Sequence, residues 1–371
     1  MKPACYSLLG LLLLLAVLLL SPACGGGGDD DATDDDAVDD DSDDDATDDD
    51  LVDDDATDDD TADDDAFGEI AFIEQTDAGM KLALVTTPLG AVTLLVDIEN
   101  HLNVYPAISP DGATVAFGSN LYDPNPGVNF ATMLYTIPVG GGDPQRLTTD
   151  NWQEVTETQP VFSPDGARIA YVRSDSQNEP TFVDRIWFTF ADGSGEYSLY
   201  TDTEVRNDWD PDYSPDGQTL VYVSDGDVGC GDLYLADLST PPFTRQRLTT
   251  SDPLTVESNS GPFFDATGQW IYFQSVRDDS VGLYKVAVTG GDPELVWDIG
   301  YSDAGPNAGM YAYSQFRPTP DRLSLVGSGA ADGTDELFIW TTIDPLADPL
   351  AVTGANLDAV DPYWWRPAAK R

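Results

Sequence analysis

Four segments of this chain repeat one pattern, in which a proline is followed by two mostly apolar residues and then by a tight turn. The first three copies end in Ser-Pro-Asp-Gly and the fourth ends in Asp-Ala-Thr-Gly. Their leading prolines are 54, 51 and 51 residues apart. A fixed period of this size is typical of stacked or circular repeat proteins, in which neighbouring units bury each other's apolar faces. The segments are Pro106–Gly112, Pro160–Gly166, Pro211–Gly217 and Pro262–Gly268.

Each unit contains further segments that favour strands. Ser-Pro-Asp-Gly matches a type I turn, which favours proline at its second position and glycine at its fourth. The run after each turn is rich in β-branched and aromatic residues, as in Arg168–Val172. A second run follows a polar loop, as in Asp232–Leu235, and a third starts with Gln-Arg-Leu-Thr-Thr at Gln145 and again at Gln246. With the strand that carries the proline, each unit has four strands, which is the composition of a propeller blade.

The two ends of the repeat region complement each other. The segment Asp361–Pro367 carries the proline strand of a further unit. Three β-rich runs at the start of the region, 69–73, 81–85 and 92–96, match the second, third and fourth strands. We therefore expect the C-terminal strand to complete the N-terminal blade, which closes the ring and removes exposed sheet edges. The prediction is an all-β fold, a six-bladed propeller of four-stranded blades over residues 67–371.

The repeat also points to a family. A proline, an apolar or aromatic pair, Ser-Pro-Asp-Gly and then a run such as Ile169-Ala-Tyr171 resemble the repeats of the TolB-like six-bladed propellers. The resemblance covers residues 67–371 and implies the fold, but it does not specify a ligand. TolB has an α/β domain before its propeller, and an acidic segment occupies that place here. The known partner of TolB is therefore not transferred to this chain.

The first 23 residues predict export. Lys2 precedes an apolar run, 8–20, which is shorter than the roughly 20 residues that a membrane-spanning helix needs. Ser-Pro-Ala and then Cys24 follow, and this order is typical of a signal peptide. It resembles a bacterial lipoprotein signal, which implies lipid attachment at Cys24. Gly25 after the cysteine implies sorting to the outer membrane, on the periplasmic side or at the cell surface. A plain secretory peptide is the alternative.

Residues 24–66 consist largely of glycine and aspartate. Eight Asp triplets between Asp29 and Asp65 hold 24 aspartates. Such dense like charge with little apolar surface favours a disordered, extended tether. A calcium-binding array is the alternative, because calcium prefers carboxylate oxygens. Tight calcium loops require a glycine for their sharp turn, and none lies between the first and last triplets.

The rest of the chain is acidic as well. Taking the 24 aspartates and Lys2 from the totals of 68 acidic and 16 basic residues leaves 44 acidic and 15 basic residues. The resulting field disfavours binding to nucleic acid and to anionic membrane surfaces. Basic peptides, basic protein faces and divalent cations remain suitable partners.

Few residues after the tether are of the types, or in the patterns, that catalytic sites need. His101 is the single histidine of the chain, whereas a serine triad needs a base and a zinc site commonly uses several imidazoles. The sequence Gly-x-Ser-x-Gly of a hydrolase nucleophile is absent, and Cys230 fits a small packed residue. We therefore predict a protein that is not an enzyme. The alternative is a calcium-dependent hydrolase or lactonase-like enzyme with a channel lined by carboxylates.

Oxygen-bearing side chains stand three residues before each clear proline of the repeat. In a propeller, the link that enters the innermost strand approaches the mouth of the central channel, so equivalent positions form a ring there. The ring would bind calcium or the basic tip of a partner. In the alternative, each side chain caps the turn that enters its own strand. The predicted ring, with two further aspartates on the same links, consists of Asn103, Glu157, Asp208, Asn259, Asp210 and Asp361.

These patterns together predict recognition without catalysis. We expect a monomeric, lipid-anchored propeller that the tether holds away from the membrane, with no cofactor apart from calcium as a candidate. The expected partner is an envelope protein or peptide, basic in charge, or cell-wall material. Contact with the membrane would run through the lipid alone, and nucleic acid is not an expected ligand.

Overall fold

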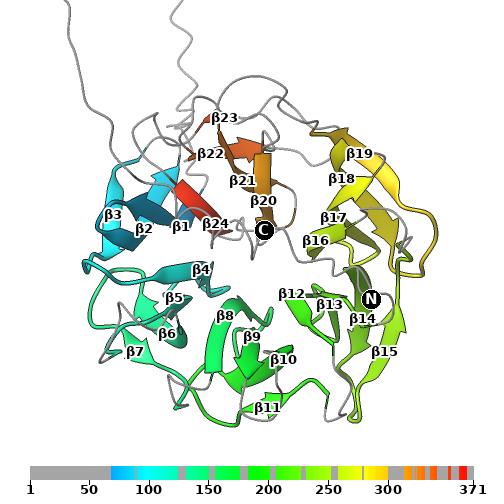
Figure 1. Ribbon diagram of the computed structural model, residues 1–371, viewed down its shortest axis with the longest axis horizontal. Helices are drawn as coiled ribbons and strands as arrows, with labels where there is room; N and C mark the ends of the chain where they lie inside the picture. Colours follow the sequence, from blue (N-terminus) through cyan, green and yellow to red (C-terminus); the bar gives the residue numbers. More distant parts are fainter. Residues whose placement is uncertain are drawn as a thin grey trace, which may run out of the picture. The chain divides into compact units, whose positions relative to one another are not determined.

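Six antiparallel sheets of four strands each are arranged as a six-bladed propeller (Figure 1). In the described residues the secondary structure consists of strands and turns, and no helix there is long and apolar enough to cross a membrane. The predicted all-β class and the predicted blade composition are confirmed. The computed structural model describes residues 68–87, 90–123, 131–149, 155–175, 183–200, 206–226, 231–251, 258–277, 280–299, 313–319, 322, 324–330, 335–340, 350–351 and 359–365.

The blades are numbered here in chain order, and the innermost strand of each is given first. Blades 1 to 3 consist of β24 (Ala359–Trp365), β1 (Gly68–Thr76), β2 (Gly79–Thr87) and β3 (Val92–Val96); β4 (Asn103–Ile108), β5 (Thr114–Ser119), β6 (Met133–Pro138) and β7 (Gln145–Arg146); β8 (Val155–Phe162), β9 (Arg168–Asp175), β10 (Val183–Phe190) and β11 (Tyr197–Ser198). Blades 4 to 6 consist of β12 (Asp208–Tyr213), β13 (Thr219–Ser224), β14 (Asp232–Asp237) and β15 (Thr244–Arg247); β16 (Ser258–Phe264), β17 (Trp270–Arg277), β18 (Ser280–Ala287) and β19 (Glu294–Asp298); β20 (Tyr313–Pro318), β21 (Leu325–Ala330), β22 (Asp335–Trp340) and β23 (Leu350–Ala351).

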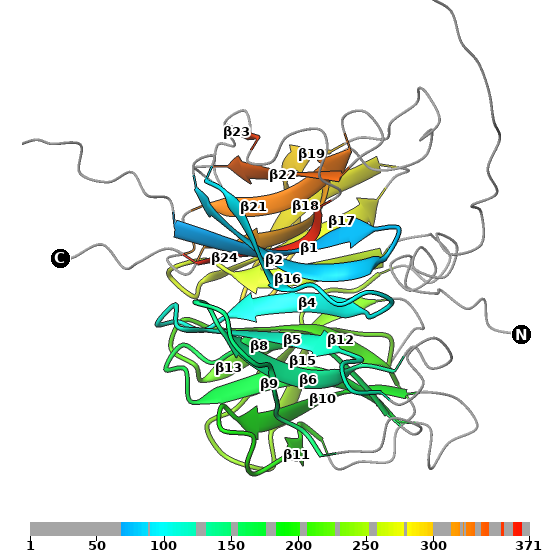
Figure 2. The same cartoon turned by 90° about the vertical axis from the view of Figure 1, so that its left-hand side faces the viewer.

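Blade 1 is built from both ends of the repeat region. Strand β24 pairs antiparallel with β1, and Glu69 lies opposite Trp365 in this pairing. Figure 1 shows β24, in red, beside the blue strand β1, and Figure 2 shows the same pair from the side. The predicted closure of the N-terminal blade by the C-terminal strand is thereby confirmed, and the ring has no open sheet edge between blades 6 and 1.

The Ser-Pro-Asp-Gly sequence turns the chain between the first and second strands of a blade. In blade 2 the Gly112 N–H donates to the Ser109 carbonyl at 2.8 Å, and the Ser109 hydroxyl donates to the Asp111 carboxylate at 2.5 Å. The Ala113 N–H donates to the same carboxylate at 3.1 Å. Gly112 has a φ of 71°, a left-handed conformation that glycine adopts without steric cost. Blades 3 and 4 repeat these bonds with Ser163 and Ser214.

Apolar side chains meet between neighbouring blades. Successive residues of a strand point to opposite sheet faces, so the second strand of blade 4 serves both neighbours. Leu220 and Tyr222 belong to a cluster with Phe188 of blade 3, whereas Val221 belongs to a cluster with Phe273 of blade 5. All five side chains are buried. Alternating apolar residues on both faces thus hold the blades side by side, and this packing fixes the positions of the innermost strands.

The turn aspartates give the propeller a dependence on pH. The Ser163 hydroxyl and then the Ala167 N–H hold the pKa of the Asp165 carboxyl below its usual range, and Asp111 and Asp216 are lowered in the same way. A pKa that is lower in the folded chain stabilises the fold above the unfolded pKa, and this contribution is lost as pH falls through the folded value. We therefore expect the melting temperature of the protein to fall as pH decreases from 5 towards 2.

The variant Asp165→Asn isolates this contribution. It should lower the melting temperature by a few degrees at pH 7, because the carboxylate that accepts the two hydrogen bonds is removed. At a pH below the folded pKa of Asp165 the difference from the wild type should vanish, since both chains then carry a neutral group there. Asp143→Asn, in the exposed loop between β6 and β7, is the control. A difference that stays constant at every pH would contradict this assignment.

Candidate functional site

The innermost strands enclose a cavity whose wall is rich in proline. Its water-accessible volume is about 70 Å³. Five of the prolines that lead the innermost strands line it, and Phe316 takes the equivalent position in blade 6. Because proline donates no backbone hydrogen bond, the wall offers few N–H groups of its own. The prolines are Pro106, Pro160, Pro211, Pro262 and Pro362.

A β-bulge lies at each of these prolines, and in blades 2, 3 and 4 the residue before the proline lines this cavity. The innermost strand carries one extra residue against its neighbour, for example between Val104 and Ala107 in blade 2. Four of the bulged residues have φ between 51° and 53°, and three of them are not glycine. A bulge bends the strand and re-aims a side chain, so these residues leave the face that packs between blades. The four are Tyr105, Gln159, Asp210 and Gly261.

Three of these residues form a chain of hydrogen bonds from blade to blade. The Gln159 side-chain amide donates to Asp210 Oδ1 at 2.7 Å and its carbonyl accepts from the Asp210 N–H at 2.9 Å. Asp210 Oδ2 in turn accepts from the Gly261 N–H at 2.8 Å. Asp210 is 7% exposed, and both of its oxygens face neutral donors in the described residues. The chain of bonds stops at Gly261, which has no side chain to continue it.

Arg322 joins three blades at the same cavity. It occupies the turn position that is glycine in blades 2 to 5, and it has a left-handed φ of 58°. Its guanidinium binds both oxygens of Asp212 in blade 4, at 2.7 and 3.2 Å. It also donates to the carbonyls of Tyr213 and Phe264, each at 2.8 Å. A bidentate ion pair of this kind is strong and directional, so Arg322 fastens blade 6 to blades 4 and 5.

Three residues of the predicted ring reach back to the preceding blade. Asn103 Nδ2 donates to the Met80 carbonyl at 2.6 Å, and Asn259 Nδ2 donates to the Gly231 carbonyl at 2.7 Å. Glu157 Oε2 accepts from the Leu134 N–H at 2.9 Å and from the Thr148 hydroxyl. All three ring residues are at most 1% exposed, and none lines the cavity. Their described bonds join consecutive blades, and their role in ligand binding stays a prediction.

Asp208 and Asp210 have only one residue between them in the sequence, but their side chains lie in different surroundings. Asp208 is 2% exposed and pairs with Arg206, whose Nε lies 3.2 Å from Asp208 Oδ2. Burial raises the pKa of Asp208, while the Ser224 hydroxyl and the Arg206 guanidinium oppose this rise. Asp208 therefore bonds within its own blade and the link that enters it, whereas Asp210 lines the cavity. The side chain of Asp361 lies outside the described residues, as does Cys24.

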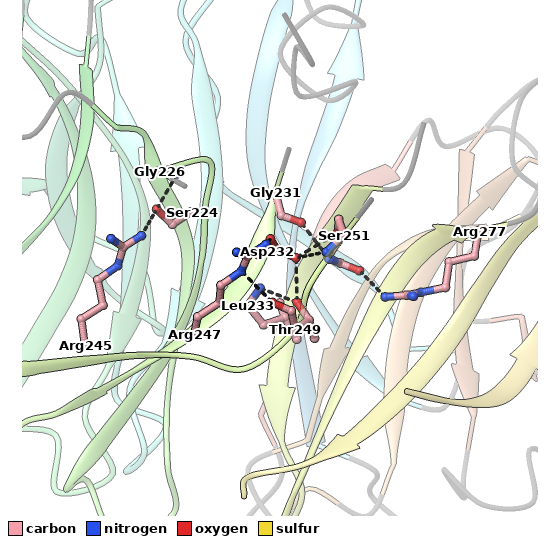
Figure 3. Close-up of polar contacts among 11 residues, drawn as sticks. Ser224, Gly226, Gly231, Asp232, Leu233, Arg245, Arg247, Thr249, Ser251 and Arg277 are labelled. Atoms are coloured by element: carbon pink, nitrogen blue, oxygen red, sulfur yellow. Dashed lines mark hydrogen bonds and ion pairs between the residues drawn. The ribbon is translucent and has the colours of Figure 1, made fainter. Parts of the chain in front are cut away.

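A second polar cluster lies between blades 4 and 5, around Asp232 (Figure 3). Asp232 Oδ1 accepts from the Thr249 hydroxyl at 3.0 Å and from the Ser251 N–H at 2.8 Å. Arg247 donates to Asp232 Oδ2 at 2.5 Å. Asp232 is fully buried and both of its oxygens are hydrogen-bonded, so the cluster stabilises the blade and offers no free ligand group. The sequence contained a signal for it, the repeated Gln-Arg-Leu-Thr-Thr of the outermost strand.

Metal-binding geometry is absent from the part of the chain that the structure describes. No group of three or more His, Cys, Asp or Glu side chains there is close enough together to hold an ion. His101 is partly exposed, and its Nδ1 lies 2.8 Å from the Glu99 carbonyl. Cys230 lies outside the described residues. Calcium binding stays a prediction.

Curated proteins match part of the sequence, and no family model matches it. The uncharacterized peptidase YuxL of Bacillus subtilis is 35% identical over 96 residues, which are 26% of this chain and 14% of that protein. The uncharacterized protein Atu1656 of Agrobacterium fabrum is 27% identical over 180 residues, which are 48% of this chain and 57% of that protein. The chain thus covers less than two thirds of the length of either relative.

Solved structures match a larger part of the chain. TolB from Acinetobacter baumannii has a TM-score of 0.60 at 16% identity, over 81% of this chain and 67% of that one. A putative TolB from Agrobacterium tumefaciens has a TM-score of 0.53 at 19% identity, over 77% of this chain and 88% of that one. The chain has the TolB-like propeller fold. The family resemblance drawn from the Ser-Pro-Asp-Gly repeats is confirmed at the level of the fold.

The TolB-like propeller also resembles enzymes. An oligogalacturonate lyase in complex with manganese has a TM-score of 0.51 at 17% identity, over 73% of this chain and 74% of that one. A propeller of this kind therefore occurs both in TolB and in enzymes, and the fold by itself indicates no activity. The function of this TolB-like propeller has to be argued from its own cavity.

Proposed function

We propose that this protein is a non-catalytic binding module of the bacterial envelope. Its propeller would recognise a partner through the proline-lined cavity, and a lipid on Cys24 would anchor it to the outer membrane. The signal-like sequence before Cys24 and the Asp-rich residues after it support the anchor and the spacing. The TolB-like fold supports a role in recognition by analogy.

The variation in side-chain type at equivalent positions of the blades supports a role in recognition most directly. Four bulged residues share one backbone conformation, with φ of 51–53°, yet Tyr105, Gln159 and Asp210 carry three different side-chain chemistries and Gly261 carries no side chain. The residues that hold consecutive blades together repeat more closely, as Asn103 and Asn259 do. Repeat proteins keep the positions that stabilise each repeat and vary those that contact ligands. The bulged positions therefore fit a binding surface carried on a uniform scaffold.

Asp210 favours a partner with a basic group. Its carboxylate lines the cavity, and the donors that it meets, Gln159 and Gly261, are neutral. Each carboxylate oxygen can accept a second hydrogen bond. The excess of acidic over basic residues after the tether also attracts cations over long distances. The partner that fits best is a basic segment of an envelope protein or peptide, and cell-wall material is the other source to be tested.

A cross-linking experiment tests this proposal. The full-length protein would be purified in detergent, cross-linked to an envelope extract and analysed by mass spectrometry. The wild type should retain a stoichiometric partner, and Asp210→Asn should retain it at least about tenfold less, because one charge-assisted contact is lost. Asp143→Asn removes the same charge from an exposed loop and should retain as much partner as the wild type.

The controls separate loss of recognition from loss of folding. Asp210→Asn also places an amide against a donor, so its melting temperature has to be measured beside its binding. If Asp210→Asn and the wild type retain equal amounts of partner, the partner does not bind at Asp210 in the cavity. Recovery of glycan in place of protein would identify cell-wall material as the ligand.

The second candidate function is a calcium-dependent enzyme that acts on an ester, a lactone or a glycan. The lyase among the similar solved structures and the carboxylates at the cavity favour it. Incubation of the protein with ester, lactone and glycan substrates, with calcium or with a chelator, distinguishes the two functions. On the binding proposal, we expect no turnover and the same partner recovery in both conditions. Calcium-dependent turnover that Asp210→Asn abolishes would establish the enzyme.

A further inference from the structure

Arg317 is a further charged residue of the cavity wall, beside Asp210, Asp212 and Arg322, and it lies on the strand β20 of blade 6. It follows the β-bulge of that strand, at the position that Asp212 occupies in blade 4. In the described part of the chain its guanidinium forms no ion pair, although Arg206, Arg247 and Arg322 each pair with an aspartate. In a chain with a large excess of carboxylates, a guanidinium left available at a cavity is unusual.

Gly261 separates Arg317 from Asp210. A Cβ atom placed on Gly261 would lie 3.6 Å from Arg317 Nη1, which is an ordinary contact distance. The Gly261 N–H is the donor that holds Asp210 Oδ2, at 2.8 Å. Gln159 holds the other oxygen of Asp210, so the carboxylate is fixed beside the glycine, and no ion pair joins it to Arg317 in the described residues. An anion and a cation thus line one cavity, and each of them lies near a residue without a side chain.

The missing side chain explains why the two charges stay apart. In blades 3 and 4 the bulged residue bonds to the bulged residue of the next blade, from Gln159 to Asp210 and from Asp210 to Gly261. No side chain at Gly261 continues this chain of bonds towards blade 6. The groups that line the cavity with Arg317 include Tyr105, Asp212 and Arg322. Asp212 and Arg322 form an ion pair with each other. The guanidinium therefore retains its donors for a ligand.

We propose that the space beside Gly261 binds the carboxylate of a dipolar ligand through Arg317, while Asp210 binds the basic group of the same ligand. This inference rests on the proposed binding function and adds the carboxylate to it. A guanidinium presents two parallel N–H donors that match a carboxylate, and the pair gains strength where water is partly excluded. Two ligand sources share this chemistry: a free basic amino acid, and the carboxyl end of a peptide that terminates in a basic residue.

Calorimetric titration of the full-length protein tests this inference with three probes: lysine, the tripeptide Gly-Gly-Lys, and the same tripeptide with an amidated carboxyl end. We expect Gly-Gly-Lys to bind at least about tenfold more tightly than its amide, which keeps the basic groups and lacks the terminal carboxylate. Binding of free lysine with equal strength would identify an amino acid as the source. Weaker binding of lysine would identify the peptide end.

Three variants assign the effect to residues. Arg317→Gln should abolish the preference for the free carboxylate, whereas Arg168→Gln, which removes the same charge at the exposed start of β9, should keep it. Gly261→Asp should weaken all three probes about tenfold or more, because its carboxylate would pair with Arg317 and fill the space. The change strains a left-handed φ of 53° at Gly261, although Asp210 already adopts nearly the same φ in blade 4. The melting temperature of each variant shows whether it folds.

The outcomes distinguish this inference from the proposed function. Equal affinity of the wild type for Gly-Gly-Lys and its amide would overturn the carboxylate site and leave recognition of a basic group by Asp210 in place. Failure of all three probes to bind would also overturn the dipolar site, while the cross-linking experiment would still decide the binding function. Retention of the preference in Arg317→Gln would assign the carboxylate to another residue.

Discussion

A chain that ends before Ala359 is expected to lose its cooperative unfolding transition and to associate through an open sheet edge. Strand β24 supplies the innermost strand of blade 1 and pairs with β1 along the whole blade. Its residue Ala359 is fully buried, and Pro362 lines the cavity. Without β24, the inner edge of β1 would present unpaired N–H and C=O groups, which template pairing with other chains.

Near-ultraviolet circular dichroism during heating and size-exclusion chromatography measure this effect. A chain that ends after Trp365 keeps every described strand and should melt as the full chain does. A synthetic peptide of residues 359–365, added to the shortened chain, should restore the transition because it replaces the missing strand. A shortened chain that melts as the full chain does would show that closure contributes little to the fold.

The variant Arg322→Gly should lower the free energy of unfolding by about 3 kcal/mol, because it leaves the Asp212 carboxylate buried without its partner. Glycine is the residue of the other turns and relieves a left-handed φ of 58°, so the backbone itself favours the change. The cost would therefore come from the lost ion pair and from the carbonyls of Tyr213 and Phe264, which lose their donor.

A double-mutant cycle by urea denaturation measures the coupling. Asp212→Ala installs the residue that occupies the equivalent position in blade 2, Ala107. Combining it with Arg322→Gly should cost less than the sum of the two single changes, since neither charge is then left unpaired. Additive costs would show that the ion pair itself adds no stability. Guanidinium salts are unsuitable here because they screen the interaction under study.

Almost all of the fold could be predicted from the sequence. Turn chemistry at Ser-Pro-Asp-Gly, the β-rich runs after it and the regular period each favoured the same architecture, and consistency of this kind specifies a structure. The closing strand was predictable because the strands at the two ends of the repeat region complement each other. In blade 6 the periodicity is less regular, since the residue at the leading proline's place is Phe316 and Pro318 stands two residues later.

Less of the candidate site could be predicted from the sequence. Spacing alone placed Asn103, Glu157 and Asn259 on the links before the prolines, but it could not show that their bonds run between blades. Asp210 was expected at the ring from its link, and it lines the cavity. Gln159 was not singled out, because the bulge that turns it into the cavity depends on pairing between strands. The left-handed φ at the bulges of blades 2 to 5 could not be predicted from residue type, since tyrosine, glutamine, aspartate and glycine all adopt it.

The pairing of β24 with β1 also determines when the molecule can finish folding. Glu69 is translated long before Trp365, yet the two residues lie side by side in one sheet. Blade 1 therefore starts with the first strands to emerge from the ribosome and is completed by the last. Contacts between such distant residues form slowly, because the loop between them has to close first. Until β24 has been translated, blade 1 lacks its innermost strand and the ring of blades cannot close.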